Sequence, residues 1–590
     1  MTALDGDFAL FDDDGGGAIV LSDYRRTISL DRGGDPESLF AALASASAQG
    51  EWVALAADYE LAACFEPAVP QFAERGLRGW VFAQARHLDA QGVTALLASR
   101  VAGLAESDRL AGVAELAAGL DGEQHRRCVE QIRRWIADGD CYQINLTFPL
   151  VGRLYGHWLA LYSRLRERQP VRYGAYLSVA EKTVLSFSPE LFFERRGDRV
   201  LARPMKGTAP RGATPAEDDA NRLALLASDK ERAENIMIVD LLRNDLGRLA
   251  APGKVRVDSL CDAEAYPSLW QVVSTVSAEL PGVTLFDLFR ALFPCGSITG
   301  APKIRAMQRI DELEVAPRGL YTGALGWLAP GGDCRFNVAI RTLEVQPDRR
   351  VRLAVGSGIV IDAVAASEYA ECLLKASFLT GFDPGFELIE TLRLEHGNYP
   401  LLALHLQRLQ SSARALGFAC ELPAIAAALA ECASSRATGL SRVRLTLAHN
   451  GQYAISLAPL IDEPGPWSVV LADERLDDKD YLLRHKTSAR SRYQRALAAL
   501  AEDPGVFDAI FLNTRGEVCE GARSNVFIER DGVLLTPALD CGLLPGVMRR
   551  HLLETGCAVE AVLGVDDLRG APAIYLANAL RGLVPVTLRT

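Results

Sequence analysis

Hydrophobic residues recur along the chain at two spacings, and each spacing predicts a different kind of element. Between Glu123 and Ala137, apolar side chains at Cys128, Ile132 and Ile136 are spaced four residues apart, as on one face of a helix. Short apolar runs, such as Phe8 to Phe11 and Trp52 to Ala56, instead predict strands. Residues 1–120 hold several such runs beside Ala-rich helical stretches.

From residue 121 to about 380 the pattern alternates between the two kinds of element, which indicates one large mixed domain. Its strands, with one from the N-terminal region, are predicted at Ala18 to Leu21, Val184 to Phe187, Arg199 to Arg203, Val338 to Val345 and Val351 to Val355. Its helices are predicted at Ala216 to Arg248, Leu285 to Leu292, Lys303 to Glu312 and Ala365 to Leu379.

Residues 381–385 carry two glycines, a proline and an aspartate, which are turn-forming residues between two regular regions. We therefore place a domain boundary there, with a second region at 386–590. Strands are predicted at Phe386 to Thr391, Arg442 to Leu447, Trp467 to Ala472 and Ala509 to Leu512, and helices at His405 to Leu416, Pro423 to Ala433 and Ser491 to Leu500.

Length and composition narrow the class of protein. A chain of 590 residues is too long for one core and indicates roughly two to four structural units. With 49% hydrophobic residues, no membrane-spanning apolar run and an acidic N-terminus, it is expected to be a globular cytoplasmic protein that contacts no membrane. The net charge of -12 and the lack of basic clusters argue against nucleic-acid binding. The 12 cysteines include no Cys-x-x-Cys pair, so we expect reduced thiols and no zinc site.

Lys206 is the most informative single residue. It follows a predicted strand and precedes a glycine-rich loop, so its ammonium has a defined place to point and can lose some of its water. Partial desolvation favours the neutral, nucleophilic amine. On this context alone, the alternative is a solvated surface charge.

Two pairs of glutamates form a second pattern. Glu231 and Glu234, like Glu368 and Glu371, lie three residues apart and share a helix face. A solvated helix surface is the simpler interpretation of either pair. Together, however, two such pairs can converge on a hard cation such as Mg2+, which takes oxygen ligands.

Seven ordered motifs follow one another between about residue 120 and residue 380: Gly139 to Leu146, Ser188 to Glu190, the Lys206 loop, Glu231 to Gly247, Gly296 to Lys303, Asn337 to Thr342 and Gly356 to Val360. In these motifs the region resembles the chorismate-utilising enzyme family, whose members include aminodeoxychorismate, anthranilate, isochorismate and salicylate synthases.

This resemblance implies a set of site residues. Glu234 and Glu371 would bind Mg2+, with Glu231 and Glu368 in or near the same cluster. Arginine forks and glycine-rich turns suit carboxylates, so Arg341 and the turn at Gly296 to Thr299 would hold those of the substrate. The full expected substrate-binding set is Gln143, Thr208, Gly296, Ser297, Thr299, Arg341, Gly356, Gly358 and Lys375.

The resemblance also indicates which reaction to expect. Lys206 stands where anthranilate synthases usually carry alanine, and it matches the lysine that attacks the chorismate ring in aminodeoxychorismate synthases. Glu190 matches the glutamate that acts as acid or base on the 4-hydroxyl. Gln143 replaces the lysine base of the water-adding members, which argues against isochorismate and salicylate chemistry. Trp270 and Gln271 replace a common histidine and can only pack against the substrate and hydrogen-bond it.

The region after residue 385 carries a second set of ordered runs: Phe386 to Arg393, His405 to Leu409, His485 to Thr487, Asn513 to Phe527, Leu535 to Pro537 and Leu543 to Arg549. In these runs it resembles the fold-type IV pyridoxal-phosphate enzymes, which include aminodeoxychorismate lyase and several aminotransferases. The resemblance implies that Lys486 holds pyridoxal 5'-phosphate covalently and that Glu520 keeps its pyridine nitrogen protonated. Arg408, Ser524, Asn525, Gly546 and Val547 complete the expected cofactor site, with the phosphate at a helix N-terminus.

One departure concerns the start of this region. Relatives usually have about twenty further residues before the Glu-Thr motif, whereas this region begins almost at Phe386. Two alternatives remain: the first domain supplies the missing segment, or the second site is unusually open. Lyases and aminotransferases share the matched residues, so this region alone does not fix the reaction.

Taken together, the resemblances imply an α+β protein. A chorismate-binding domain like that of anthranilate synthase, with a β-sandwich core and surrounding helices (N-terminal segment 1–120, catalytic segment 121–380), precedes an α/β domain of fold-type IV. The expected function is 4-aminobenzoate synthesis for folate: amination of chorismate, then elimination of pyruvate. Ammonia is expected from a separate glutamine amidotransferase subunit, and a homodimer through the second domain is left open. The alternative is an aminodeoxychorismate or anthranilate synthase joined to an aminotransferase.

Overall fold

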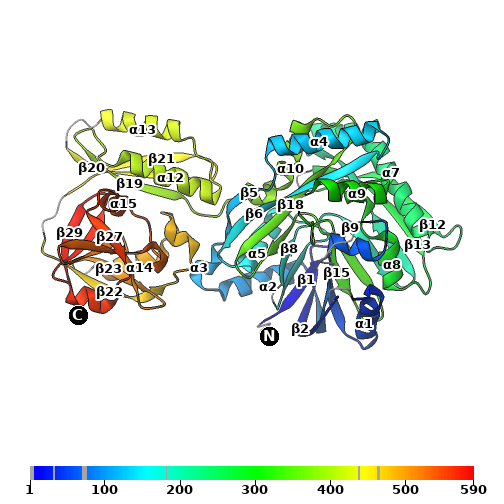
Figure 1. Ribbon diagram of the computed structural model, residues 1–590, viewed down its shortest axis with the longest axis horizontal. Helices are drawn as coiled ribbons and strands as arrows, with labels where there is room; N and C mark the ends of the chain where they lie inside the picture. The colour runs from blue at the N-terminus through cyan, green and yellow to red at the C-terminus, as the bar shows by residue number, and fades with distance from the viewer. Residues whose placement is uncertain are drawn as a thin grey trace. The chain divides into compact units, whose positions relative to one another are not determined.

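The computed structural model describes residues 6–30, 34–69, 76–180, 182–266, 269–314, 316–435, 439–461, 465–501, 503 and 505–589, apart from the side chain of Lys230. The first five residues, which belong to the acidic N-terminus noted above, lie outside this set. The chain forms two units, each built from more than one stretch of sequence (Figure 1). The first unit takes in residues 1–104, 117–154 and 158–382, and the second takes in 105–116, 155–157 and 383–590.

In the first unit, antiparallel strands pair in one long succession. In order of pairing they are β14 (Gly300–Ala301), β6 (Gln143–Tyr155), β18 (Arg350–Ile359), β17 (Thr342–Val345), β8 (Lys182–Ser186), β7 (Ala175–Val179), β1 (Phe8–Asp12), β2 (Ala18–Ser29), β4 (Leu77–Leu88), β3 (Trp52–Ala57), β15 (Ala324–Leu328), β16 (Cys334–Val338), β9 (Leu191–Arg196), β10 (Arg199–Arg203) and β13 (Leu269–Glu279). Strand β13 also pairs with β11 (Met205–Pro210) and β12 (Val255–Ala265).

Helices cover this strand core. They are α1 (Pro36–Ala48), α2 (Ala90–Ala102), α4 (Gly122–Ala137), α5 (Trp158–Arg168), α6 (Pro215–Ala227), α7 (Asp229–Gly247), α8 (Leu285–Leu292), α9 (Lys303–Leu313), α10 (Ala365–Lys375) and α11 (Ser377–Thr380), with 3-10 turns η1 (Tyr59–Cys64) and η2 (Gly296–Ile298).

Strand β3 illustrates why the sheet is buried on both faces. Val53 and Leu55 pack in a core shared with helices α1, α7 and α8, whereas Ala54 and Ala56 pack among strands β1, β2 and β7. Successive side chains of a strand point to opposite faces, so both faces of β3 find apolar partners. The expected α+β fold with surrounding helices is confirmed.

Two predicted elements are interrupted. The helix predicted over Ala216 to Arg248 is broken at Ser228, whose backbone is extended (φ -70°, ψ 111°) and whose side chain caps α7 by accepting a bond from the Glu231 N–H. The strand predicted over Val338 to Val345 is split because Arg341 adopts a left-handed conformation (φ 49°) between β16 and β17.

The second unit contains two sheets. The smaller consists of β19 (Leu388–Glu395), β20 (Leu440–Leu447) and β21 (Tyr453–Pro459), with α12 (Leu402–Leu416) and α13 (Leu422–Ser434). The larger has the order β24 (Val518–Gly521), β23 (Val506–Asn513), β22 (Trp467–Leu476), β29 (Gly582–Leu588), β28 (Ile574–Asn578), β25 (Asn525–Arg530), β26 (Val533–Pro537) and β27 (Ala558–Ala561). Because β24 also pairs with β25, the strands from β24 to β25 close into a ring.

Shorter helices connect these strands. They are η3 (Tyr481–Arg484), α14 (Ser491–Ala499), η4 (Leu539–Cys541), α15 (Val547–Glu554) and α16 (Val565–Gly570).

The second unit also contains residues from far earlier in the chain. Helix α3 (Glu106–Arg109) and most of β5 (Gly112–Ala118) belong to it. Ala114 and Tyr155 are buried in the same apolar cluster as Phe386 and Leu388. Residues from before position 386 therefore contribute to the second unit, in agreement with the first of the two alternatives given for its short start.

None of the described helices combines the length and the apolar composition that crossing a bilayer requires.

Candidate functional site

Lys206 lies on β11, at an irregular point of the strand. Its register with β13 shifts between Lys206 and Thr208, and Gly207 between them has a φ of 77°. Gln271 donates a hydrogen bond from Nε2 to the Gly207 carbonyl oxygen at 2.8 Å. A local bulge of this kind re-aims the neighbouring side chain, so the backbone around Gly207 sets the direction of the lysine.

Glu190 and Lys206 are joined through Ser297. The Ser297 Oγ donates to Glu190 Oε1 at 2.6 Å, and Lys206 Nζ donates to the Ser297 carbonyl oxygen at 3.3 Å. Burial raises the pKa of Glu190 to about 7, although the Ser297 hydrogen bond and the charge of Lys206 oppose this shift. At neutral pH this carboxyl can therefore both give and take a proton.

The residues expected to bind the substrate carboxylates are the turn at Gly296 to Thr299 and Arg341. The turn Gly296–Ile298 carries Ser297 itself, and buried Thr299 follows it. The half-buried guanidinium of Arg341 makes no hydrogen bond with any described residue, and burial lowers its pKa. A desolvated guanidinium without an acidic partner is suited to a carboxylate ligand.

The remaining members of the expected set are arranged around β6 and β18. A Cβ on Gly358 would lie 2.5 Å from Gln143 Nε2, so the glycine makes room for the buried glutamine. Lys375 Nζ donates to the Gly356 carbonyl oxygen at 2.8 Å. Thr208 is exposed on β11.

Trp270 and Gln271 hold the Lys206 loop in place. Trp270 Nε1 donates to Asp218 at 3.0 Å, and Gln271 is bonded to Gly207 as described. The polar N–H groups of both residues are thus already engaged with the protein. Sequence reasoning missed this supporting role because only the fold brings β13 beside the loop.

The four glutamates expected at a metal site lie on α7 and α10. Glu371 is half exposed and pairs with Lys375 at 2.8 Å. Within the described residues of the chain, no three His, Cys, Asp or Glu side chains lie close enough together to hold a metal ion. As placed, these residues do not fit the ligand set that Mg2+ requires, so the magnesium site stays a prediction and no step is derived through it.

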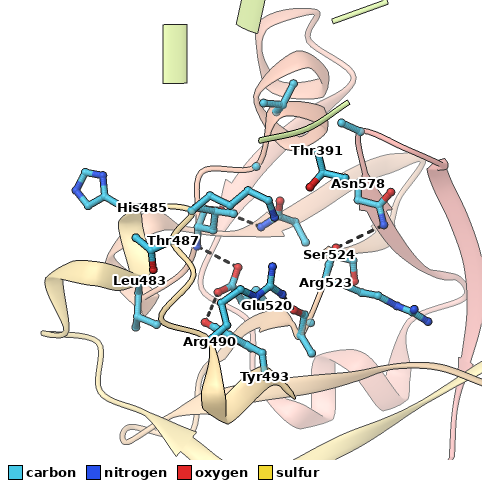
Figure 2. A pocket seen from close by; sticks show the side chains of 18 of the residues that line it. Thr391, Leu483, His485, Thr487, Arg490, Tyr493, Glu520, Arg523, Ser524 and Asn578 are labelled. Carbon is cyan, nitrogen blue, oxygen red and sulfur yellow. Dashed lines mark hydrogen bonds between the residues drawn. The ribbon is translucent and has the colours of Figure 1, made fainter. Parts of the chain in front are cut away.

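In the second unit, a cavity of about 340 Å3 gathers the residues expected to hold pyridoxal phosphate (Figure 2). All of them line it: Arg408, Lys486, Glu520, Ser524, Asn525, Gly546 and Val547. Its size is in the usual range for small-molecule sites.

Lys486 and Glu520 are the titratable pair of this cavity. Burial, assisted by the charges of Arg490 and Arg408, lowers the pKa of Lys486 to about 7. Burial raises the pKa of Glu520 to about 7. Tyr493 donates its OH to Glu520 Oε1 at 2.6 Å (Figure 2). The Leu544 N–H donates to Glu520 Oε2 at 3.0 Å, and the two bonds together fix the carboxyl. A lysine with so low a pKa is a ready nucleophile at neutral pH.

The cavity also has groups suited to a phosphate. Arg408 makes two hydrogen bonds to Glu390, from Nε at 2.9 Å and from Nη2 at 2.6 Å. Gly546 begins helix α15, and a Cβ there would lie 1.9 Å from Asn525 Oδ1. The helix N-terminus and its close-packed glycine form a cradle for an anion, so the residues present fit the cofactor.

Sequence reasoning missed three members of this site. Tyr493 gave no signal because its partner Glu520 is distant in sequence. Glu390 and His405 lie within the matched motifs, but their mutual bond (2.6 Å) appears only in the fold.

Comparison with known families agrees with the two-domain organisation. The family model described as chorismate binding enzyme matches residues 37–381, and that described as amino-transferase class IV matches residues 387–588.

Two curated relatives, with different names, are equally similar to the chain. Aminodeoxychorismate synthase component 1 of Bacillus subtilis is 42% identical over 251 residues, which are 42% of this chain and 53% of the relative. Anthranilate synthase component 1 3 of Haloarcula marismortui is 42% identical over 252 residues, which are 42% of this chain and 50% of the relative. The chain thus matches about half the length of each of these relatives.

A solved structure supports the fold of the first unit. The crystal structure of anthranilate synthase component I from Streptococcus pneumoniae aligns with 64% of this chain and 93% of its own, at 24% identity and a TM-score of 0.53.

Proposed function

Because the chain belongs to the family of chorismate binding enzymes, we propose that its first unit aminates chorismate to 4-amino-4-deoxychorismate. The second unit then removes pyruvate from this intermediate and yields 4-aminobenzoate, a folate precursor. Two consecutive steps on one chain form a coherent pathway.

The observation that carries the first step is the placement of Lys206 and Glu190 on either side of Ser297. The amine of Lys206 would bond to the chorismate ring while Glu190 gives a proton to the departing 4-hydroxyl, which leaves as water. Ammonia then bonds to the carbon that carried the hydroxyl, and the lysine leaves. One difficult substitution is thereby split into two easier ones.

Overall identity does not separate this reaction from anthranilate synthesis, because relatives of both names are equally similar. Lys206 makes the distinction, since anthranilate synthases usually carry alanine at the matching position. Arg341 and the turn at Gly296 to Thr299 would hold the two carboxylates of chorismate.

The experiment is product analysis by mass spectrometry from chorismate, ammonium, Mg2+ and pyridoxal phosphate. The native chain is expected to release 4-aminobenzoate, and Lys206→Ala is expected to lose about 100-fold or more of the first step. Formation of 2-aminobenzoate, or full turnover by Lys206→Ala, would overturn the proposal.

For the second step, bound pyridoxal phosphate would supply an electron sink for the substrate amine. Lys486 would hold the cofactor, and its amine, once released, would move the ring proton as pyruvate departs. Glu520 would keep the pyridine nitrogen protonated, while Arg408, Gly546 and Val547 would bind the phosphate. Lys486→Ala should accumulate 4-amino-4-deoxychorismate and release no 4-aminobenzoate.

A second candidate for this unit is an aminotransferase, which the description of the matched family favours. The two are separated by supplying 2-oxo acids and measuring amino-group transfer. Efficient transfer without release of 4-aminobenzoate would select the aminotransferase.

Ammonia is proposed to come from a separate glutamine amidotransferase subunit, with free ammonium as a poorer substitute. The name component 1 of the Bacillus subtilis relative supports this arrangement. Addition of such a subunit with glutamine should raise the rate above that with ammonium, and failure to do so would remove the partner from the proposal.

A further inference from the structure

The cavity around Lys486 has a wall that comes from far earlier in the chain. Glu106, Ser107 and Leu110 line it, although the class IV family match begins only at residue 387. These residues belong to the second unit itself.

The wall segment, Ala105–Leu110, is held on its polar side by helix α14. Glu106 Oε2 accepts a hydrogen bond from Arg495 Nη1 at 2.7 Å, and Arg495 also donates to Glu474 at 3.0 Å. The hydrogen bonds from Arg495 and Ser491 lower the pKa of Glu106. Helix α14 carries Tyr493, which fixes Glu520, so the wall segment and the cofactor partner share one support.

The backbone of the wall segment, and of the residues that follow it, is anchored as well. The His157 N–H donates to the Asp108 carbonyl oxygen at 2.9 Å. Gly156 has a φ of 66°, and a Cβ there would lie 2.2 Å from the Leu110 carbonyl oxygen, so the two stretches touch closely. Tyr481 donates its OH to Glu115 at 3.0 Å, and Ala114 is buried in the core. These contacts hold the segment in a fixed position as part of the cavity wall.

The cofactor-binding residues and the wall segment contribute different contacts to the cavity. All groups expected to hold the cofactor come from residues 408–547, so the cofactor contacts are complete without the wall segment. What the segment adds is one apolar side chain, Leu110, one hydroxyl, Ser107, and the carboxylate of Glu106, which is paired with Arg495. An apolar contact beside a hydroxyl suits a substrate with a hydrocarbon ring and carboxylates.

We propose that Leu110 and Ser107 contact the substrate of the second step and determine its selectivity. Glu106 is a positioning residue that holds the segment against α14. This inference rests on the proposed function, because it takes 4-amino-4-deoxychorismate as the substrate.

The test uses the full chain with Leu110→Trp, which fills the cavity, and Leu110→Ala, which widens it. The matched control is Arg109→Trp, at an exposed neighbour outside the described lining. Both Leu110 variants should raise the KM for 4-amino-4-deoxychorismate about tenfold, with kcat changed less. The absorbance of bound pyridoxal phosphate and the rate of the first step should match those of the native chain.

A second readout does not depend on turnover. With pyridoxal phosphate reduced onto the native chain by borohydride, addition of 4-aminobenzoate should slow amide hydrogen exchange in residues 105–111 but not in helix α2. Unchanged KM in both Leu110 variants, together with unchanged exchange, would overturn the inference while the native chain still works. A native chain that binds the cofactor but releases no 4-aminobenzoate would instead overturn the proposed function.

Discussion

At the scale of single residues, burial gives Glu190 the properties of an acid–base group. It is 4% exposed, and the Ser297 hydroxyl and the charge of Lys206 partly offset the loss of water around its carboxylate. The sequence resemblance identified this glutamate, and the fold shows the physical reason for its pKa near neutrality.

The first step should therefore depend on pH through Glu190. With a pKa of about 7, the proton-donating form is lost as pH rises above 7, so kcat/KM at a fixed concentration of unprotonated ammonia should fall there. Ser297→Ala removes a hydrogen bond that lowers this pKa, so the fall should move to higher pH. An unchanged pH profile of kcat/KM in Ser297→Ala would contradict the assignment of this pKa to Glu190. Glu190→Gln should lose the pH dependence and about 100-fold of the rate.

Glu390 is also buried, but its charged and hydrogen-bonding partners lower the pKa of its carboxyl. Burial alone would raise its pKa, but the charge of Arg408 and hydrogen bonds from His405 and Arg408 lower it from 4.5 to about 2. A lowered carboxyl pKa stabilises the folded chain above pH 4.5, and this contribution is lost as pH falls towards 2.

Urea unfolding of the full chain at several pH values measures this contribution. The native chain should lose up to about 3 kcal/mol more than Glu390→Gln between pH 4.5 and 2. At pH 7, Glu390→Gln should be the less stable chain, because Arg408 loses its buried charge partner. Parallel pH curves for the two chains would rule out this role.

At the scale of elements, the bulge in β11 determines where Lys206 points. Gly207 has a left-handed φ of 77°, and a Cβ there would lie 2.7 Å from Glu231 Oε2. The left-handed conformation favours glycine, and a side chain at this position would also force Glu231 to shift.

Gly207→Ala should consequently impair the first step and leave the second intact. We expect a loss of about 1–2 kcal/mol in stability and about tenfold or more in amination rate. Gly197→Ala is the matched control: its φ of 56° is also left-handed, but the space around it is open. Equal amination by the two variants would show that strain alone, and not the position of Lys206, matters.

The bounds of helices and strands were predictable from the sequence where one face of the element is buried. They were not predictable where polar contacts determine where an element ends. Helix α4 follows its apolar spacing closely, and β10 has the predicted bounds. Strand β2 continues to Ser29, beyond the predicted Leu21, because its polar second half is ordered by pairing with β4 rather than by burial. The break at Ser228 depends on a capping bond that periodicity does not register.

The residues of the candidate sites were likewise predictable only in part. Motifs named Lys206, Glu190, Lys486 and Glu520, which the fold brings to two places. Tyr493 and the wall segment were not predictable, because their proximity to Glu520 and Lys486 arises from distant stretches of the chain. The magnesium ligands stay a prediction, since glutamate spacing fixes a shared helix face but not the distance between two helices.

At the scale of the whole molecule, each unit has its own apolar core and its own candidate site. A mixture of Lys206→Ala and Lys486→Ala chains should therefore release 4-aminobenzoate, although neither does so alone. The first unit of one variant supplies the intermediate that the second unit of the other consumes. No product from the mixture, with each intact step active separately, would mean that the intermediate passes only within one chain.

The way the polypeptide is threaded has a consequence for dissecting it. Because the second unit is assembled from three separate stretches, a protease cut at the turn 381–385 would sever only one of the covalent links between the units. A gene fragment encoding 386–590 would likewise lack Ala114 and Tyr155 from its core and Leu110 from its cavity. The second unit therefore depends, for its core and for its cavity wall, on residues encoded within the first 157 positions of the chain.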